Sequence, residues 1–311
     1  MIKSNLFFSF IVCLITTSYA QNYKKVDSIA LSYPSKFSTP EKLAKRISKD
    51  FQNDFEKLRA LYTWIANNVI YDPAESGKFL YEYSNKREFE RKEEKFNNKL
   101  SNRVISKKKA ICQGYATLFK KVCDELNIKS KYVSGASKTE IKDIGKRFFS
   151  DHAWNIVLID NKEYLIDVTW GAGTYSNYFQ KKLNYFYFLT DPKLFIKKHY
   201  PDYFENAILK EKIKEEEFLN APLVYNYDYE LINPQTGIIK MHESDKVQFV
   251  FSTEKPVTSI NYRLNNENHS ITNFTQVNNM LKFDINLSKF NRAKELILFF
   301  NYKTVIGFKI K

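Results

Sequence analysis

The sequence has few cysteines, glycines and prolines: 3, 8 and 8 among 311 residues. Three cysteines are too few for a disulfide scaffold, and so little glycine and proline excludes a collagen-like or low-complexity chain. Beyond the first 20 residues, no run is apolar enough to cross a membrane. With 43% hydrophobic and 27% charged residues, the chain is too apolar for a disordered protein and too mixed for a coiled coil. These limits leave one large globular domain or two ordinary ones.

The chain has little negative charge relative to positive, with 49 Lys and Arg against 35 Asp and Glu and a formal net charge of +14. Such an excess can indicate a nucleic-acid or anionic-surface partner. Acidic residues are nevertheless interspersed throughout, and no basic and aromatic motif accompanies the charge. We therefore predict no nucleic-acid partner and read the excess as a solvated, Lys-rich surface, with Lys107–Lys109 as the one local cluster.

The N-terminus has the three-part plan of a secretory signal peptide. Lys3 supplies a positive charge, Leu6–Ile15 is apolar, and Ser18–Ala20 offers small residues for cleavage. We expect residues 1–20 to be removed and the protein to be secreted, or periplasmic and associated with the cell envelope. An uncleaved membrane anchor is the alternative, although the apolar run is short for one.

Only Cys112 and Cys123 remain after that cleavage. They lie 11 residues apart in what the pattern predicts to be one helix, hence about 16 Å apart. A disulfide needs Cα atoms within about 7 Å, so these two cannot bridge each other. At least one free thiol in an exported protein calls for a reason. Cys123 falls in an apolar stripe and is interpreted as a packing residue.

Hydrophobic periodicity predicts an α+β protein. Helical spacing covers residues 40–70 and 112–126, and residues 86–100 read as a solvated helix or an insertion. Residues 152–159 and 163–170 alternate as a β-hairpin should, and residues 184–189 look like a further strand.

From about residue 222 the pattern changes to short strands separated by turn residues, which predicts a β-sandwich of the immunoglobulin-like type. The predicted organisation is therefore a signal peptide over residues 1–20, a first domain over 21–205, a helical connector over 206–221 and a β-rich domain over 222–311.

Three residues could together carry nucleophilic chemistry. Cys112 starts the strongest predicted helix, just after Lys107–Lys109, and both features favour the reactive thiolate. A nucleophilic cysteine also needs a base and a group that orients the base. His152 opens the first hairpin strand and Asp167 lies near the end of the second. In an antiparallel hairpin with an even-length loop, their odd separation puts them on one face, offset by two to four residues depending on the register.

Each of these residues alone has a plainer explanation. A cysteine at a helix start is commonly a core residue, a histidine among aromatics is commonly hydrogen-bonded in a core, and an aspartate at a strand end is commonly a cap. Among the other histidines, His199 is interpreted as structural, whereas His242 and His269 are expected to face solvent.

Four local sequence motifs favour the catalytic interpretation over these plainer ones: YTWIANNVIYD, KKAICQGYATLFKKVC, DHAWNIVLID and EYLIDVTWG. In this order and spacing they resemble the transglutaminase-like superfamily, particularly its branch related to kyphoscoliosis peptidase and fungal cytokinesis proteins. The resemblance covers about residues 40–205. It implies a papain-like core, in which a helix bearing the nucleophile packs on an antiparallel sheet bearing the histidine and aspartate.

By matching position, the resemblance makes Cys112 the nucleophile, His152 the general base and Asp167 the orienting residue. The backbone N–H of Cys112 would be one oxyanion donor. Gln113, Trp64 and Trp154 are weaker candidates for oxyanion or substrate contacts, with core packing as the alternative for the two tryptophans.

The implied reaction is acyl transfer on a protein or peptide amide through a thioester, without a cofactor or metal. Opening of the thioester by water gives a peptidase or amidase, which we favour, and opening by a Lys amine gives a crosslinking transglutaminase. The non-enzymatic alternative is a catalytically silent scaffold that uses its β-rich domain to bind a partner, for which a cell-envelope component is the natural choice.

Overall fold

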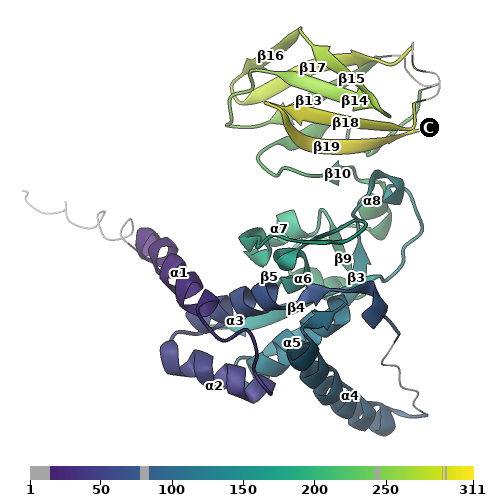
Figure 1. Cartoon of the computed structure of the whole chain (residues 1–311). Coiled ribbons are helices and arrows are strands. Elements are labelled where there is room, and N and C mark those ends of the chain that lie inside the picture. Colours follow the sequence, from purple (N-terminus) through teal and green to yellow (C-terminus); the bar gives the residue numbers. More distant parts are fainter. Residues whose placement is uncertain (1–14, 78–83, 242–245, 289, 291–292) are drawn as a thin grey trace, which may run out of the picture. The chain divides into compact units, whose positions relative to one another are not determined.

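A computed structural model describes residues 15–77, 84–241, 246–288, 290 and 293–311 of the chain (Figure 1). The chain divides into two compact units. The first contains the residues up to 133 together with 153–190, and the second contains 134–152 and 191–311.

The first unit is rich in helices. Its helices, including 3-10 turns written η, are α1 (Ile15–Leu31), α2 (Pro40–Asp50), α3 (Asp54–Asn68), η1 (Pro73–Glu75), α4 (Lys86–Lys107), α5 (Cys112–Glu125), α6 (Val168–Ala172) and η3 (Tyr185–Tyr187). The strands that lie in it wholly or in part are β1 (Ile70–Tyr71), β2 (Lys109–Ala110), β3 (Ser130–Ser137), β4 (His152–Ile159), β5 (Lys162–Ile166), β6 (Gly173–Tyr175), β7 (Phe179–Lys181) and β8 (Phe188–Thr190). The boundary between the units cuts β3 after Val133 and β4 after His152.

The predicted helix over residues 40–70 is two helices. Asn53 separates them, because its side chain accepts hydrogen bonds from the backbone N–H groups of Phe55 and Glu56 and so caps the start of α3. Phe51, between the two helices, is buried and keeps the apolar spacing unbroken through the interruption.

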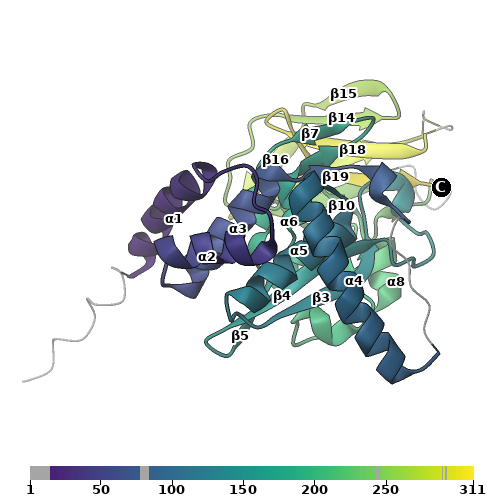
Figure 2. The ribbon, with the colours of Figure 1, turned by 60° about the horizontal axis from the view of Figure 1, so that its bottom comes forward.

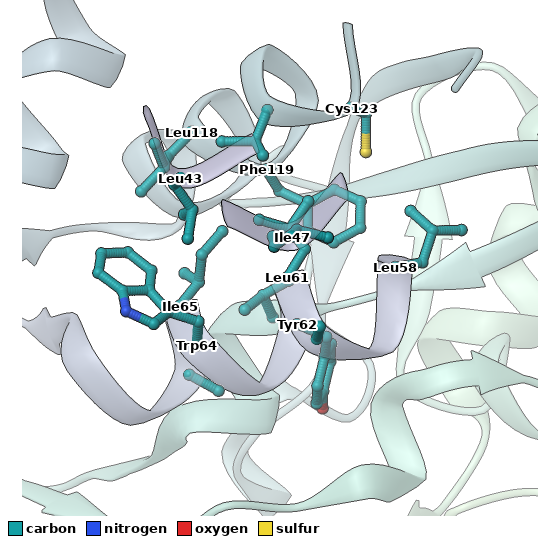
Figure 3. Packing of buried hydrophobic residues seen from close by; sticks show 14 of the residues in the cluster. Leu43, Ile47, Leu58, Leu61, Tyr62, Trp64, Ile65, Leu118, Phe119 and Cys123 are labelled. Carbon is teal, nitrogen blue, oxygen red and sulfur yellow. The ribbon is translucent and has the colours of Figure 1, made fainter. Parts of the chain in front are cut away.

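Helices α2, α3 and α5 share one hydrophobic core with strands of the sheet (Figure 3). Figure 3 shows Ile47 of α2, Leu61 of α3 and Phe119 of α5 packed together. The same cluster contains Val157 of β4 and Ile166 of β5. A helix starting at a cysteine therefore packs against the predicted hairpin, and the mixed helix and sheet prediction is confirmed.

Helix α4 runs beside α5 (Figure 2), and Gly114 lets the two approach closely. A Cβ atom at Gly114 would lie 2.8 Å from the Cβ of Ala110 and 3.0 Å from a methyl of Val104, closer than such atoms ordinarily come. Glycine is therefore required where α5 begins.

Helix α1 is part of the folded unit beyond the predicted cleavage site. Val26 and Ala30 are buried, and Asp27 accepts hydrogen bonds of 2.7 and 2.8 Å from the guanidinium of Arg59. Most of the predicted signal peptide lies outside the described residues, so that prediction stays open. Among the residues the structure describes, no helix is both long and apolar enough to span a membrane.

The central sheet has the strand order β8-β5-β4-β3-β9, where β9 is His199–Pro201. Neighbouring strands pair antiparallel at β8–β5, β5–β4 and β3–β9. The predicted strand over 163–170 ends at Ile166, because Asp167 caps α6. The predicted strand over 184–189 is instead the turn η3 followed by β8.

The second unit consists mainly of strands. Its remaining elements are η2 (Ile141–Asp143), α7 (Pro192–Phe195), η4 (Phe204–Ala207), α8 (Glu215–Asn220), β10 (Leu223–Val224), β11 (Glu230–Asn233), β12 (Ile238–Ile239), β13 (Lys246–Ser252), β14 (Ile260–Leu264), β15 (Glu267–Ile271), β16 (Phe274–Val277), β17 (Met280–Asn286), β18 (Glu295–Phe300) and β19 (Lys303–Ile310).

These strands form two stacked sheets (Figure 1). One has the order β10-β19-β18-β14-β15, with β12 also on β19, and the other has the order β11-β13-β17-β16. Phenylalanines join them across one core: Phe249 packs edge-on against Phe308, and Phe251 against Phe300. The β-rich C-terminal region is thus present, and its assignment as immunoglobulin-like stays a prediction.

Candidate functional site

Cys112 stands at the first position of α5, where the sequence predicted it. Parallel pairing of β2 with β1 fixes the backbone that leads into it, with Lys109 opposite Ile70. The cysteine is 9% exposed and clusters with two small residues, Ala116 of α5 and Ala153 of β4. The thiol therefore lies beside the residue that directly follows His152 in the chain.

The lysines before Cys112 do not act as one charge cluster. Lys107 ends α4, and Lys108 takes a left-handed conformation with φ of 57° that closes that helix. The ammonium of Lys109 lies 3.0 Å from the Asp72 carboxylate. Because Lys109 has an acidic partner, part of the positive field expected at Cys112 is neutralised. The helix start remains the main local feature that favours an anion there.

The register of the hairpin brings His152 and Asp167 to one face. β4 pairs with β5 so that Asn155 lies opposite Ile166 and Ile159 opposite Lys162. Continued by one step, this register places Trp154 opposite Asp167. His152 is then offset from Asp167 by two residues, about 7 Å along the strand, and shares its face. The structure thus selects the smaller of the offsets that the sequence allowed.

The Asp167 carboxylate is buried and has a second, structural task. Its Oδ1 accepts a hydrogen bond of 3.0 Å from the backbone N–H of Trp170 and so caps α6. The backbone N–H of Asp167 donates to the carbonyl of Tyr187, which fixes the residue against the neighbouring segment. The plainer interpretation of Asp167 as a cap is therefore confirmed, and it is compatible with orienting a histidine through the other oxygen.

A second histidine joins this pair. Ligand atoms of His152, Asp167 and His199 all lie within 4.8 Å of one another, and all three side chains are buried. The His199 ring stacks on Phe195 with centroids 3.9 Å apart, and its centroid is 5.4 Å from that of His152. This arrangement of nitrogen and oxygen atoms is one that a divalent metal can use. Nothing in the sequence indicated it, because His199 stands far along the chain and reaches the site only through the pairing of β9 with β3.

The weaker sequence candidates have different positions. Trp64 is fully buried in the helical core, where its indole N–H donates to the carbonyl of Pro34, which favours the packing alternative. Trp154 is also buried, two residues after His152 on β4. Gln113 lines a cavity of about 10 Å³ beside Gly114, which has room for about one water molecule.

Asn155 is a site-supporting residue that the sequence analysis missed. Its side-chain amide donates to the carbonyls of Ala116 on α5 and Lys131 on β3, at 3.1 and 3.3 Å. It therefore ties the strand that begins at His152 to the helix that begins at Cys112. The signal was a polar residue in the buried, otherwise apolar run of β4.

Cys123 occupies the opposite end of the same helix. Both cysteines are free, as predicted from their spacing. Cys123 is fully buried in the helical core (Figure 3), and burial raises the pKa of its thiol well above the ordinary value. A thiol held protonated in this way is a poor nucleophile.

Comparison with known proteins supports the predicted resemblance. Residues 41–166 match the family model of the Transglutaminase-like superfamily. Over 229 residues, 71% of this chain, the sequence is 30% identical to kyphoscoliosis peptidase of Homo sapiens, and the match spans 32% of that protein. The chain therefore covers about a third of this relative.

Two solved structures are similar at lower identity. One is described as a candidate cysteine protease from Cytophaga hutchinsonii, with 22% identity, a TM-score of 0.29, and coverage of 48% of this chain and 42% of that chain. The other is described as a TGase, with 18% identity, a TM-score of 0.30, and coverage of 55% and 43%.

Proposed function

We propose that this chain, which carries a transglutaminase-like domain over residues 41–166, is a cysteine-dependent acyl-transfer enzyme that acts on protein amide bonds. Cys112 is the nucleophile, His152 the general base and Asp167 the residue that orients it. The observation that carries the proposal is the hairpin register, which puts His152 and Asp167 on one face two residues apart, while Cys112 packs against Ala153.

The roles follow from the chemistry of each group. The Cys112 thiolate attacks the amide carbonyl, and protonated His152 gives its proton to the leaving amine, which leaves a thioester on the sulfur. The start of α5 favours negative charge through its backbone N–H dipoles, and in this proposal it stabilises the oxyanion. Asp167 keeps the imidazole of His152 in the required tautomer and orientation.

Hydrolysis is the outcome we favour, with the protein a peptidase or amidase. In that reaction His152 removes a proton from water, and the hydroxide opens the thioester to release the acid and regenerate the thiol. A Lys amine in place of water would give a crosslinked product. In the proposed setting, the protein is exported through residues 1–20 and meets protein substrates at the cell envelope, where the β-rich region binds a partner.

Thiol labelling tests the catalytic role. Iodoacetamide at pH 6, followed by mass spectrometry of the peptides, should modify Cys112 rapidly, because the proposed imidazolium partner stabilises its thiolate. An ordinary thiol is almost entirely protonated at this pH and reacts slowly. His152→Ala should slow this modification by about 100-fold, since the thiolate loses its imidazolium partner. Cys123 should remain unmodified in both proteins.

Equal and slow modification of the two cysteines in the folded protein would contradict the proposal and favour the silent scaffold. Incubation of the wild-type protein with casein and an excess of a fluorescent primary amine then separates the two reactions. New peptide termini indicate hydrolysis, and amine incorporated into glutamine side chains indicates transfer. Cys112→Ala is the control that should abolish either product.

A further inference from the structure

A cavity of about 200 Å³ lies in the second unit. It is lined by the segment that leads into β4 and by Phe218 and Leu219 of α8. Its wall runs from Ala136 on β3 to Asp151, the residue directly before His152. Consecutive Cα atoms are 3.8 Å apart, so the cavity reaches the immediate neighbour of the proposed general base. The volume is below that of pockets for drug-sized ligands and suits a single side chain.

The wall of this cavity is built from fixed elements. The Asp143 carboxylate accepts hydrogen bonds from the backbone N–H groups of Thr139 and Glu140, which closes the turn η2. The N–H of Gly145 donates to the carbonyl of Leu219 at 2.8 Å, so the loop is bonded to α8. A cavity held in this way needs little rearrangement to receive a ligand.

Lys138 is a buried residue of the cavity lining. It is 1% exposed, and its ammonium donates to the carbonyls of Phe218 and Ala221 at 2.5 and 2.7 Å. Burial lowers the pKa of Lys138 to about 7. Its hydrogen-bond partners are neutral carbonyls, so they do not cancel its charge when it is protonated.

The rim adds two cations and an exposed aromatic ring. Lys146 pairs with Asp143 at 2.9 Å, and Asp151 accepts a hydrogen bond from the N–H of Ser137. Arg147 is exposed, and within the described part of the chain no acidic side chain pairs with it. Phe149, also on the wall, is 74% exposed. Both carboxylates of the lining are already engaged, so the guanidinium of Arg147 adds an uncompensated positive charge whatever the protonation state of Lys138.

We infer that this cavity is a substrate subsite that receives an acidic side chain, Glu or Asp, of the peptide to be cleaved. A guanidinium binds a carboxylate through two parallel hydrogen bonds, which Arg147 can supply at the rim. Phe149 offers an apolar surface for the methylene groups of the same residue. The inference rests on the proposed function, because the cavity can be a substrate subsite only if the neighbouring His152 is the general base.

The test measures binding rather than turnover. The full chain with Cys112→Ala is titrated with three blocked pentapeptides, acetyl-Ala-Ala-Xaa-Ala-Ala-amide with Glu, Gln or Lys at the centre, and binding is followed by NMR. The Glu peptide should bind about tenfold more tightly than its neutral Gln isostere, and the Lys peptide most weakly. The preference should shrink between 50 and 500 mM salt, because an exposed ion pair is screened.

Arg147→Gln should remove the Glu preference. Lys282→Gln changes the same charge at an exposed position on β17 and should leave the preference intact. Equal binding of the Glu and Gln peptides, or a preference that survives Arg147→Gln, would overturn the inference.

Labelling of Cys112 in the wild-type protein separates the two proposals. A reactive Cys112 without a Glu preference rejects the subsite alone. A Glu preference without a reactive Cys112 rejects the catalytic role, and the cavity is then an acidic-peptide site of a binding protein.

Discussion

The two ends of α5 hold the same residue type in opposite surroundings. At the start, Cys112 retains 9% exposure among the small side chains of Ala116 and Ala153. At the other end, Cys123 is fully buried in the large aliphatic and aromatic core (Figure 3). The first end faces the strand that begins with His152, and the second lies within the packed core.

Under the proposed function, the position on the helix, and not the residue type, decides which cysteine is reactive. The first turn of a helix exposes unbonded N–H groups that stabilise an anion, whereas a cysteine near the end gains nothing from them. Burial then raises the pKa of the Cys123 thiol and removes its reactivity. The same helix therefore holds the proposed nucleophile at one end and a core residue at the other.

The largest expected effect comes from removing the orienting carboxylate, which should make Cys112 as inert as Cys123. Asp167→Asn should slow iodoacetamide labelling of Cys112 at pH 6 by about 100-fold, because His152 loses the charge that holds its protonated form. Asn is as good a helix cap as Asp, so the hydrogen bond to the Trp170 N–H is retained.

Asp167→Ala separates the two tasks of the residue. It should slow labelling to the same extent and also lower the free energy of unfolding by about 1 kcal/mol more than Asp167→Asn, because the cap of α6 is lost. Urea denaturation measures this difference. Rapid labelling of Cys112 in either variant would show that Asp167 is a cap and nothing more.

The next prediction tests whether the position of the start of α5 depends on the close approach between α5 and α4. Gly114→Val should cost about 2 kcal/mol of unfolding free energy, because the new side chain must occupy space held by Ala110 and Val104. Cys112 labelling should slow, since the helix start is displaced, while Cys123 stays unlabelled. Lys120→Val, on the same helix, is the control and should cost less than 1 kcal/mol in urea denaturation. Equal costs for the two variants would contradict the packing argument.

The sequence predicted the start of α5 at Cys112 better than it predicted the surroundings of that residue. Spacing alone put His152 and Asp167 on one face, but the offset depended on where the hairpin loop is centred. The structure centres it on Asp160 and Asn161, with φ of 50° and 61°, which is the geometry of a two-residue turn. Short polar residues tolerate this conformation, but the run Asp160-Asn161-Lys162 did not by itself fix where an even-length loop is centred.

Other features were beyond local pattern because they depend on tertiary contacts. The break between α2 and α3 was hidden, since Phe51 and Phe55 continue the four-residue spacing through it. His199 enters the site by strand pairing between segments far apart in sequence, which no local period reports. The helix α5 could be predicted because its signal, an apolar stripe, lies within one segment.

A smaller effect is expected from the side chain that ties β4 to α5 and β3. Asn155→Asp keeps the volume of the side chain but removes the N–H donors to the carbonyls of Ala116 and Lys131. The free energy of unfolding should fall by about 2 kcal/mol, because buried acceptors lose their donor and a carboxylate faces them. Labelling of Cys112 should slow as β4 loosens. Unchanged stability of Asn155→Asp by urea denaturation at pH 7 would show that these hydrogen bonds do not hold the site.

The smallest effect concerns the buried end and follows from its titration. The folded state raises the pKa of Cys123, so above the ordinary thiol pKa of about 8.5 the unfolded chain loses a proton that the folded chain keeps. The folded state then binds more protons than the unfolded state, and stability falls as pH rises, by about 1.4 kcal/mol per pH unit from this group. The contribution of the Cys123 thiol to folding stability is therefore fully present below pH 8.

Cys123→Ala should cost about 1 to 2 kcal/mol of unfolding free energy at pH 7, because a small cavity replaces the sulfur. The difference in unfolding free energy from wild type should narrow between pH 8.5 and 10. Urea denaturation at four pH values measures this narrowing. A constant difference would mean that Cys123 titrates as an exposed thiol does, and the contrast between the two ends of α5 would then lose its electrostatic basis.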